Sequence, residues 1–148
     1  MFTSTSDLAT ALITATARFN RLVRQRAGQF SDAIDTPSLP VWRALAIFDE
    51  HQPLRVTDFA AIDLVSQPTA TALLRRMGAD GLIARRPDPD DGRASLLELT
   101  DAGREALHQH RRRGSEVVTP LLSDLTPGQL AILAEATTIL TALMDDHA

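Results

Sequence analysis

The 148-residue sequence contains no cysteine, which excludes disulfides, thiolate metal sites and a thiol-based redox sensor. It has no lysine or tyrosine, and aromatic residues make up 4% of the chain, too few for a stacking platform that binds single-stranded nucleic acid. No uninterrupted apolar run approaches the roughly 18 residues of a transmembrane helix, and Asp7 stands where a signal peptide carries basic residues. We therefore expect a cytoplasmic protein.

The composition suits one compact domain. A hydrophobic content of 44% is enough to bury a core of ordinary size. The 15 basic residues, all arginine, stand against 19 acidic ones and give a net charge of −4. The chain as a whole therefore has no electrostatic attraction for nucleic acid or for a membrane, and any basic surface must be local.

Helical periodicity marks both ends of the chain. Apolar residues recur at helical spacing over about residues 6–26, then in a long helix over about 100–122, and then in a terminal helix that starts at the capping box of residues 126–129. Residues 27–37 are rich in turn formers and predict a loop. The terminal helix has more apolar surface than an isolated monomer normally exposes. We expect residues 1–30 and 100–148 to form a helical dimerisation region.

The middle block, residues 38–99, begins with three predicted helices. The first starts after Ser38 and ends near His51, Thr57 can cap a second short helix, and Ser66 can cap a third. Gly81 is expected to end the third helix in a left-handed conformation.

Two extended segments follow, at residues 82–86 and 94–99, on either side of a loop dense in turn residues. Two short capped helices followed by a hairpin are the parts of a winged helix-turn-helix, in which one helix enters the DNA major groove and the hairpin lies alongside. The predicted fold class is mainly α with a small β-wing, a winged helix-turn-helix with N- and C-terminal dimerisation helices.

The helix after Ser66 has one apolar stripe, and its other faces carry hydrogen-bonding and cationic side chains. Such side chains pair with base edges in the major groove, and a helix N-terminus can hold a phosphate. The alternative is that these residues only cap the helix and form a solvated face. The predicted DNA-binding residues of this helix are Ser66, Gln67, Thr69, Thr71, Arg75 and Arg76.

Arg93 closes the hairpin loop among three aspartates. We predict that Asp91 supports the wing by pairing with Arg93, whose guanidinium then reaches the minor groove. A purely structural turn salt bridge is the alternative. Residues 72–94 hold five Arg against four Asp, a net of +1. Because this patch is only weakly basic, strong DNA binding would require a dimer that doubles the phosphate contacts.

These motifs resemble the MarR family, the multiple-antibiotic-resistance-type transcriptional regulators, over about residues 38–103. The resemblance implies a homodimer on a pseudopalindromic operator in double-stranded DNA, and repression relieved by a small aromatic or acidic effector. It also implies that the predicted DNA-binding residues of the helix, together with Arg93 of the wing, make the DNA contacts. The residues that carry it are Ser66-Gln67-Pro68-Thr69-Ala70-Thr71, Leu73, Arg76, Asp80-Gly81-Leu82-Ile83, Arg85-Arg86, Asp88-Pro89-Asp90-Asp91-Gly92-Arg93, Leu99-Thr100 and Gly103.

The sequence departs from this family pattern in three ways. Leu64 stands where many members have a turn glycine, so the turn is expected to have a different shape. Ala72 occupies a position that is often basic, which removes one expected DNA contact. The absence of cysteine excludes the oxidation-sensing branch of the family.

Other constellations are weaker. The four histidines, at 51, 108, 110 and 147, lack metal-ligand spacing, so neither a metal nor another cofactor is expected. No nucleophile elbow or phosphate-binding glycine loop occurs, so we expect no enzyme activity. The three arginines at 111–113 are interpreted as a solvated face, with contact to DNA phosphate or across a dimer as alternatives.

Trp42 and Phe48 are interpreted as core residues. In the alternative they line a ligand pocket, with Arg24, Arg43 or His51 binding an acid. The predicted function is a sequence-specific DNA-binding regulator, a repressor released by a small molecule. A winged-helix protein-interaction module without specific DNA binding is the alternative function.

Overall fold

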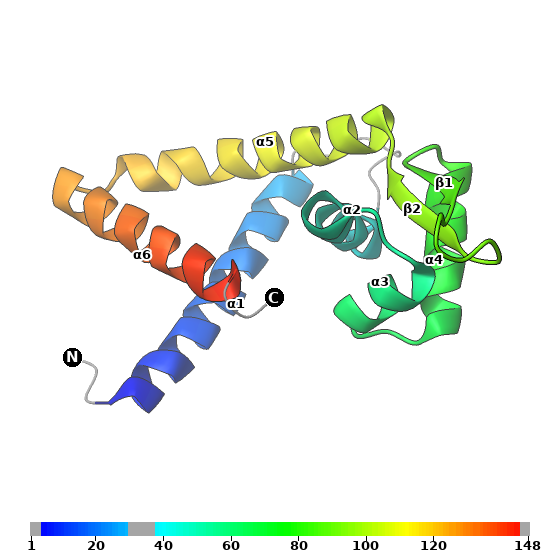
Figure 1. Cartoon of the computed structure of the whole chain (residues 1–148). Coiled ribbons are helices and arrows are strands. Elements are labelled where there is room, and N and C mark those ends of the chain that lie inside the picture. The colour runs from blue at the N-terminus through cyan, green and yellow to red at the C-terminus, as the bar shows by residue number, and fades with distance from the viewer. Residues whose placement is uncertain (1–3, 30–37, 146–148) are drawn as a thin grey trace. The chain divides into compact units, whose positions relative to one another are not determined.

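The computed structural model describes residues 4–29 and 38–145. It divides into two compact units, residues 1–30 with 114–148 and residues 31–113, and the fifth helix contributes to both. Figure 1 labels the elements along the chain. They are α1 (Thr5–Gln29), α2 (Leu39–His51), α3 (Val56–Ile62), α4 (Gln67–Ala79), β1 (Ile83–Pro87), β2 (Ser95–Leu99), α5 (Asp101–Ser123) and α6 (Pro127–Asp145).

The element order agrees with the sequence prediction, with two local differences. The first helix continues to Gln29, so residues 27–29 of the predicted loop are helical; residues 30–37 of that loop lie outside the described residues. The short helix α3 begins two residues earlier than expected, because Arg55 and not Thr57 is its N-cap residue. The backbone N–H of Arg55 donates to Asp58 Oδ2 at 3.3 Å, which satisfies part of this helix end.

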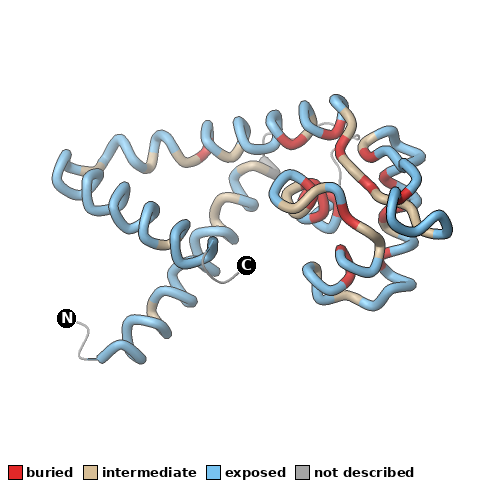
Figure 2. Tube along the Cα trace, in the orientation of Figure 1, coloured by how far each residue is buried: buried red, intermediate tan, exposed pale blue. Residues whose placement is uncertain are grey.

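The second unit contains the hydrophobic core (Figure 2). Phe48 of α2 and Phe59 of α3 are fully buried and stack with ring centroids 5.5 Å apart. The predicted apolar stripe of α4 faces this core, with Leu74 and Met77 buried and Leu73 half-buried. The core therefore fixes which face of α4 remains outside.

The ends of α4 follow the sequence prediction. Ser66 Oγ accepts the backbone N–H of Thr69 at 3.4 Å, which makes Ser66 the N-cap. Gly81 follows the helix with a φ of 73°, in the left-handed region where glycine is favoured. The N–H of Leu82 then donates to the carbonyl of Met77 at 2.9 Å and closes the helix end.

The wing is an antiparallel pair, with Ile83 opposite Leu99 and Pro87 opposite Ser95. Leu54 adds an isolated bridge to Leu97, through backbone hydrogen bonds of 3.0 and 2.8 Å. The strand residues that face the core are buried, whereas β1 is exposed after its first residue. The wing is thus anchored at its base and open along β1.

Gly103 allows α5 to begin directly against the wing. A Cβ at this position would lie 2.1 Å from the carbonyl oxygen of Leu82, closer than any real contact. Thr100 accepts the N–H of Gly103 at 3.0 Å and donates its own hydroxyl to the carbonyl of Gly81 at 2.6 Å. The Leu-Thr-x-x-Gly motif therefore joins the wing to α5.

The first unit has little buried surface. Its predicted capping box is present, since Thr126 N–H donates to Gln129 Oε1 at 2.9 Å and Gln129 N–H donates to Thr126 Oγ1 at 3.3 Å. No described residue of α6 is buried, and Figure 2 shows this helix exposed along its length. Large apolar side chains such as Ile13 and Ile132 are 71% and 68% exposed.

The sequence predicts no membrane-spanning segment, whereas α6 is by length and composition long and apolar enough to be one. Its 19 residues have a mean hydropathy of 1.2. Length and composition do not distinguish a membrane span from a helix whose apolar side chains pack against another protein chain.

Candidate nucleic-acid interface

The N-terminus of α4 presents two hydroxyl side chains to solvent. Ser66 and Thr69 are exposed, and their hydroxyl oxygens lie 2.8 Å apart in a mutual hydrogen bond. The pair caps the helix and uses one of its two hydroxyl protons in the mutual bond. The other hydroxyl proton and the backbone N–H of Gln67 are the donors with which this end of α4 can bind a phosphate, as predicted for Ser66 and the N-terminus of this helix.

The exposed face of α4 carries the remaining predicted residues of the helix. Gln67, Thr71 and Arg75 lie at successive i, i+4 positions and form one row. Thr71 donates its hydroxyl proton to the carbonyl of Gln67 at 2.8 Å. The guanidinium of Arg75 makes no ion pair within the described residues, whereas Arg76 lies 3.7 Å from Asp80. Of the two arginines, Arg75 is the one whose charge is available to a ligand.

In the turn between α3 and α4, Leu64 adopts a backbone conformation that glycine favours, so its φ gives no sign of the different turn shape expected from the sequence. Leu64 has a φ of 54°, in the left-handed region, and its side chain is 91% exposed. A left-handed conformation costs a non-glycine residue roughly 1–2 kcal/mol. Arg43 of α2 holds the start of this turn. Its guanidinium donates to both oxygens of the buried Asp63 carboxylate, and the bond from Nη2 to Oδ2 is 3.0 Å long.

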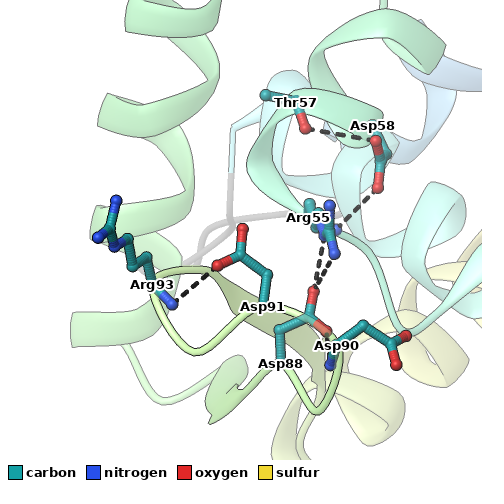
Figure 3. A network of polar contacts seen from close by, with 7 residues as sticks. All are labelled: Arg55, Thr57, Asp58, Asp88, Asp90, Asp91 and Arg93. Atoms are coloured by element: carbon teal, nitrogen blue, oxygen red, sulfur yellow. Dashed lines mark hydrogen bonds and ion pairs between the residues drawn. The ribbon is translucent and has the colours of Figure 1, made fainter.

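A second buried carboxylate anchors the wing (Figure 3). The side chain of Asp88 is 2% exposed and accepts two bonds from the Arg55 guanidinium, at 2.6 and 2.7 Å. Its other oxygen accepts the backbone N–H of Asp90 at 2.9 Å. The backbone N–H of Asp90 and the guanidinium of Arg55 together lower the pKa of Asp88, against the opposing effect of its burial. The carboxylate therefore stays ionised and links the N-cap of α3 to the wing.

Asp91 contacts Arg93 differently from the prediction. Its Oδ1 accepts the backbone N–H of Arg93 at 3.0 Å, and no ion pair joins the two side chains in the described structure. Two residues along a tight turn place a backbone N–H, rather than a distant guanidinium, beside the carboxylate. Figure 3 shows the Arg93 side chain extending away from the aspartates. Asp91 thus shapes the loop, and the exposed guanidinium of Arg93 is left free for another partner.

Neither arginine–aspartate anchor was predicted from the sequence. Arg55 and Asp88 are 33 residues apart, and Arg43 and Asp63 are 20 apart, so no local pattern pairs them. The sequence contained one signal for the Arg55–Asp88 anchor. Arg55 precedes α3 at the N-cap position, and an arginine side chain cannot accept a hydrogen bond from the first backbone N–H groups of a helix. Because Arg55 does not cap the helix in this way, its guanidinium can pair with a distant carboxylate.

The residues suggested as the lining of a ligand pocket make other contacts in the structure. Phe48 is fully buried and Trp42 is 9% exposed, as the core interpretation predicted. Arg43 is engaged by Asp63, which leaves it unavailable to an acidic ligand. Trp42 stacks on His110 of α5 with centroids 4.1 Å apart.

Beside this stack, Arg111 pairs with Asp49 at 2.8 Å. These two contacts hold the first half of α5 on α2. Arg111 is therefore part of a helix-to-helix contact and not simply of a solvated face.

Comparison with known proteins agrees with this geometry. The MarR family model matches residues 38–95, which cover α2 to the start of β2. The HTH-type transcriptional repressor IacR of Pseudomonas putida is 26% identical over 92 residues, which is 62% of this chain and 55% of that protein. An HTH-type transcriptional regulator of Mycobacterium tuberculosis is 27% identical over 146 residues, or 99% of both chains.

The solved structure of Streptococcus pneumoniae FabT in complex with DNA has the same fold. It superposes with a TM-score of 0.65 at 18% identity, and the match covers 95% of this chain and 99% of that one. The relatives are named as transcriptional regulators and not as enzymes. From the helix order, the wing, the motif-bearing residues and these matches together, we conclude that residues 38–95 form a MarR family domain, and that the chain is similar to proteins named as transcriptional regulators.

Proposed function

We propose that this chain is a homodimeric, sequence-specific repressor that binds a pseudopalindromic operator and is released by a small aromatic or acidic molecule. The observation that carries the proposal is the exposed face of α4 beside a wing whose Arg93 has no ionic partner in the described structure. Gln67, Thr71 and Arg75 can read base edges, and Ser66 with Thr69 can hold a phosphate. The repressor named among the relatives supports the direction of regulation.

Self-association is proposed because the first unit exposes its apolar side chains. An apolar helix such as α6 is stable in water only when a partner covers it, and the likeness to this family favours a protein partner in the cytoplasm over a bilayer. A second copy also doubles the phosphate contacts, which compensates for the weak local charge. Two recognition helices related by a two-fold axis would then occupy two half-sites of one operator.

The test is a titration of the purified protein into a fluorescent duplex from its own upstream intergenic region. A scrambled duplex serves as competitor, and the titration is run at two salt concentrations. We expect specific binding that weakens steeply with salt. Equal binding to the scrambled duplex, in a sample free of small molecules, would instead support the protein-interaction module.

Two variants assign the contacts. Arg93→Ala should weaken operator binding without loss of fold stability, since its guanidinium makes no ion pair in the described residues. Arg75→Ala should cost about 1–3 kcal/mol and relax the preference at one base pair if it reads a base edge, or lower the salt slope by about one if it holds phosphate. Arg104→Ala is the matched control, because Arg104 lies on α5 and pairs with Asp101.

Release is tested in the same assay with aromatic acids and neutral aromatic compounds. The proposal expects at least one class to displace the protein from its operator while leaving non-specific binding unchanged. Displacement by none of them would remove the ligand-release part of the proposal and leave the DNA-binding part intact.

A further inference from the structure

The exposed face of α4 has apolar side chains at its centre and polar side chains on either side of them. A shallow surface hollow is lined by Gln67, Pro68, Thr71, Ala72 and Arg75. Pro68 and Ala72 lie one helical turn apart on the same side of the helix, and neither side chain has a hydrogen-bonding atom. Gln67 and Arg75 supply polar groups toward the two ends. A ligand that fits this hollow needs a small apolar group flanked by hydrogen-bonding atoms.

Thr71 contributes to the apolar centre more than to the polar ends. Its hydroxyl proton is already donated to the carbonyl of Gln67 at 2.8 Å. A hydroxyl has only one proton, so Thr71 offers a ligand its methyl group and an acceptor lone pair, but no donor. Three neighbouring residues, Pro68, Thr71 and Ala72, therefore present aliphatic carbon at the centre of the face.

The major groove of DNA offers one base with matching chemistry. Thymine alone among the four bases carries a 5-methyl group, and alanine and the threonine methyl are the side-chain groups that contact it. Adjacent purines offer N7 with N6 or O6, which pair with glutamine and arginine. We propose that this hollow receives the 5-methyl group of one thymine in each operator half-site, and that Ala72 is the residue that makes the protein sensitive to it.

The inference rests on the proposed function and names a specificity determinant for it. Ala72 has the smallest side chain among the residues that line the hollow, and it is exposed. Its methyl group therefore leaves room above it for the methyl group of a base. The operator is therefore expected to place a thymine where it faces Ala72.

The test removes only the methyl group. The preferred operator is first obtained by selection from a random duplex library, and each thymine is then replaced in turn by uracil, which pairs identically. We expect one thymine per half-site at which the replacement weakens binding about fourfold, the value of one buried methylene-sized group. Replacement at the other thymines should leave the affinity nearly unchanged.

A protein variant then assigns the effect to Ala72. In Ala72→Ser the ratio of affinities for the thymine and uracil operators should fall toward one, because a hydroxyl replaces a hydrogen of the alanine methyl group. Ala79→Ser is the matched control, since Ala79 is an exposed alanine at the other end of the same helix and should keep the fourfold ratio. Circular dichroism and a thermal melt confirm that both variants are folded.

The outcomes separate this inference from the proposed function. Specific binding that is insensitive to every thymine-to-uracil replacement overturns the inference and leaves the DNA-binding regulator intact. A sensitivity that persists unchanged in Ala72→Ser also overturns it, because the methyl group is then read elsewhere on the protein. If selection enriches no sequence at all, the proposed function fails and the inference fails with it.

Discussion

The two units of this chain use their large apolar side chains in opposite ways. In the second unit Leu45 and Phe48 are fully buried, whereas in the first unit Ile13 and Ile139 are 71% and 54% exposed. The second unit therefore carries its own hydrophobic stabilisation, and the first must obtain it from contact with another surface. We therefore expect folding and the proposed self-association to depend on different parts of this small protein.

Charges follow the same division. In the second unit two buried carboxylates, those of Asp63 and Asp88, are 1% and 2% exposed and are held by arginines of other elements. In the first unit α1 carries four exposed arginines, while residues 114–145 carry four acidic residues and no basic one. Opposite charges on separate helices favour their pairing when two copies meet.

The largest effect should come from a core truncation in the second unit compared with the same change in the first. Leu45→Ala should lower the free energy of unfolding by about 2–5 kcal/mol, because Leu45 is fully buried. Urea denaturation should show the same decrease in the free energy of unfolding at every protein concentration. Leu133→Ala, at a residue of α6 that is 46% exposed, should instead raise the dimer dissociation constant measured by sedimentation. If Leu133→Ala left the sedimentation behaviour unchanged, α6 would not be at the interface.

A smaller loss is expected where α5 leaves the wing. Gly103→Ala should destabilise the protein by about 1–3 kcal/mol, since the added Cβ would lie 2.1 Å from the Leu82 carbonyl oxygen and backbone must move. The control is Gly114→Ala on the same helix, where no atom lies within 4 Å and the better helix propensity should add up to about 1 kcal/mol. Thermal melts of the two variants should therefore shift in opposite directions.

A gain is expected at the turn before the recognition helix. Leu64→Gly should stabilise the protein by roughly 1 kcal/mol, because glycine adopts the left-handed conformation of Leu64 without steric cost and little apolar burial is lost. Gly81→Ala, at a φ of 73°, should lose a similar amount. A destabilised Leu64→Gly variant would show that the leucine side chain packs against a partner in solution.

The wing anchor should affect both folding and DNA binding. Asp88→Asn removes the charge that holds Arg55, so the wing should sample more positions and operator affinity should fall, by less than in Arg93→Ala. Asp90→Asn is the control, since Asp90 contributes its backbone N–H to the anchor. Unchanged affinity in Asp88→Asn would remove the positioning role.

The pH dependence of this anchor has a definite sign. Because the pKa of Asp88 is lowered in the folded protein, its stabilisation is complete above the ordinary value of 3.8 and is lost as the pH falls below it, through the lowered pKa. Operator binding near neutral pH should therefore be independent of Asp88 protonation.

The smallest effect concerns the contact between α2 and α5. Partial burial against Trp42, with the positive charges of Arg113 and Arg111, lowers the pKa of His110 below its ordinary value of 6.5. The folded state then binds fewer protons than the unfolded chain between the lowered pKa and 6.5, so the free energy of unfolding should fall as the pH drops through that window. Above pH 6.5 this contribution is complete.

Fluorescence of Trp42, the only tryptophan of the chain, reports this titration directly. The midpoint of the fluorescence change should lie below pH 6.5. His110→Ala should abolish the step, whereas the neighbouring variant His108→Ala should retain it. A midpoint at or above 6.5 would contradict the lowered pKa.

Most of the local architecture was predictable from sequence. The N-cap at Ser66, the left-handed Gly81 and the capping box at residues 126–129 are local signals, and each has the predicted geometry. The N-cap of α3 was wrong, because the side chain of Arg55 is committed to the distant Asp88. The predicted pairing of Asp91 with the Arg93 side chain was wrong for a different reason, since a backbone N–H lay closer.

The DNA-binding roles of the α4 and wing residues remain predictions. The structure shows that these side chains are exposed on α4 and on the wing loop, and the DNA titrations above decide whether they bind.

Sequence alone determined the helices, the N-cap of α4, the hairpin and the likeness to the MarR family, because hydrophobic periodicity and turn chemistry act over a few neighbouring residues. Tertiary structure alone decided which arginines remain available to DNA. Arg43 and Arg55 are consumed by carboxylates 20 and 33 residues away, while Arg75 and Arg93 make no ion pair within the described residues. Charge pairing depends on distance in space, which no spacing along the chain reveals.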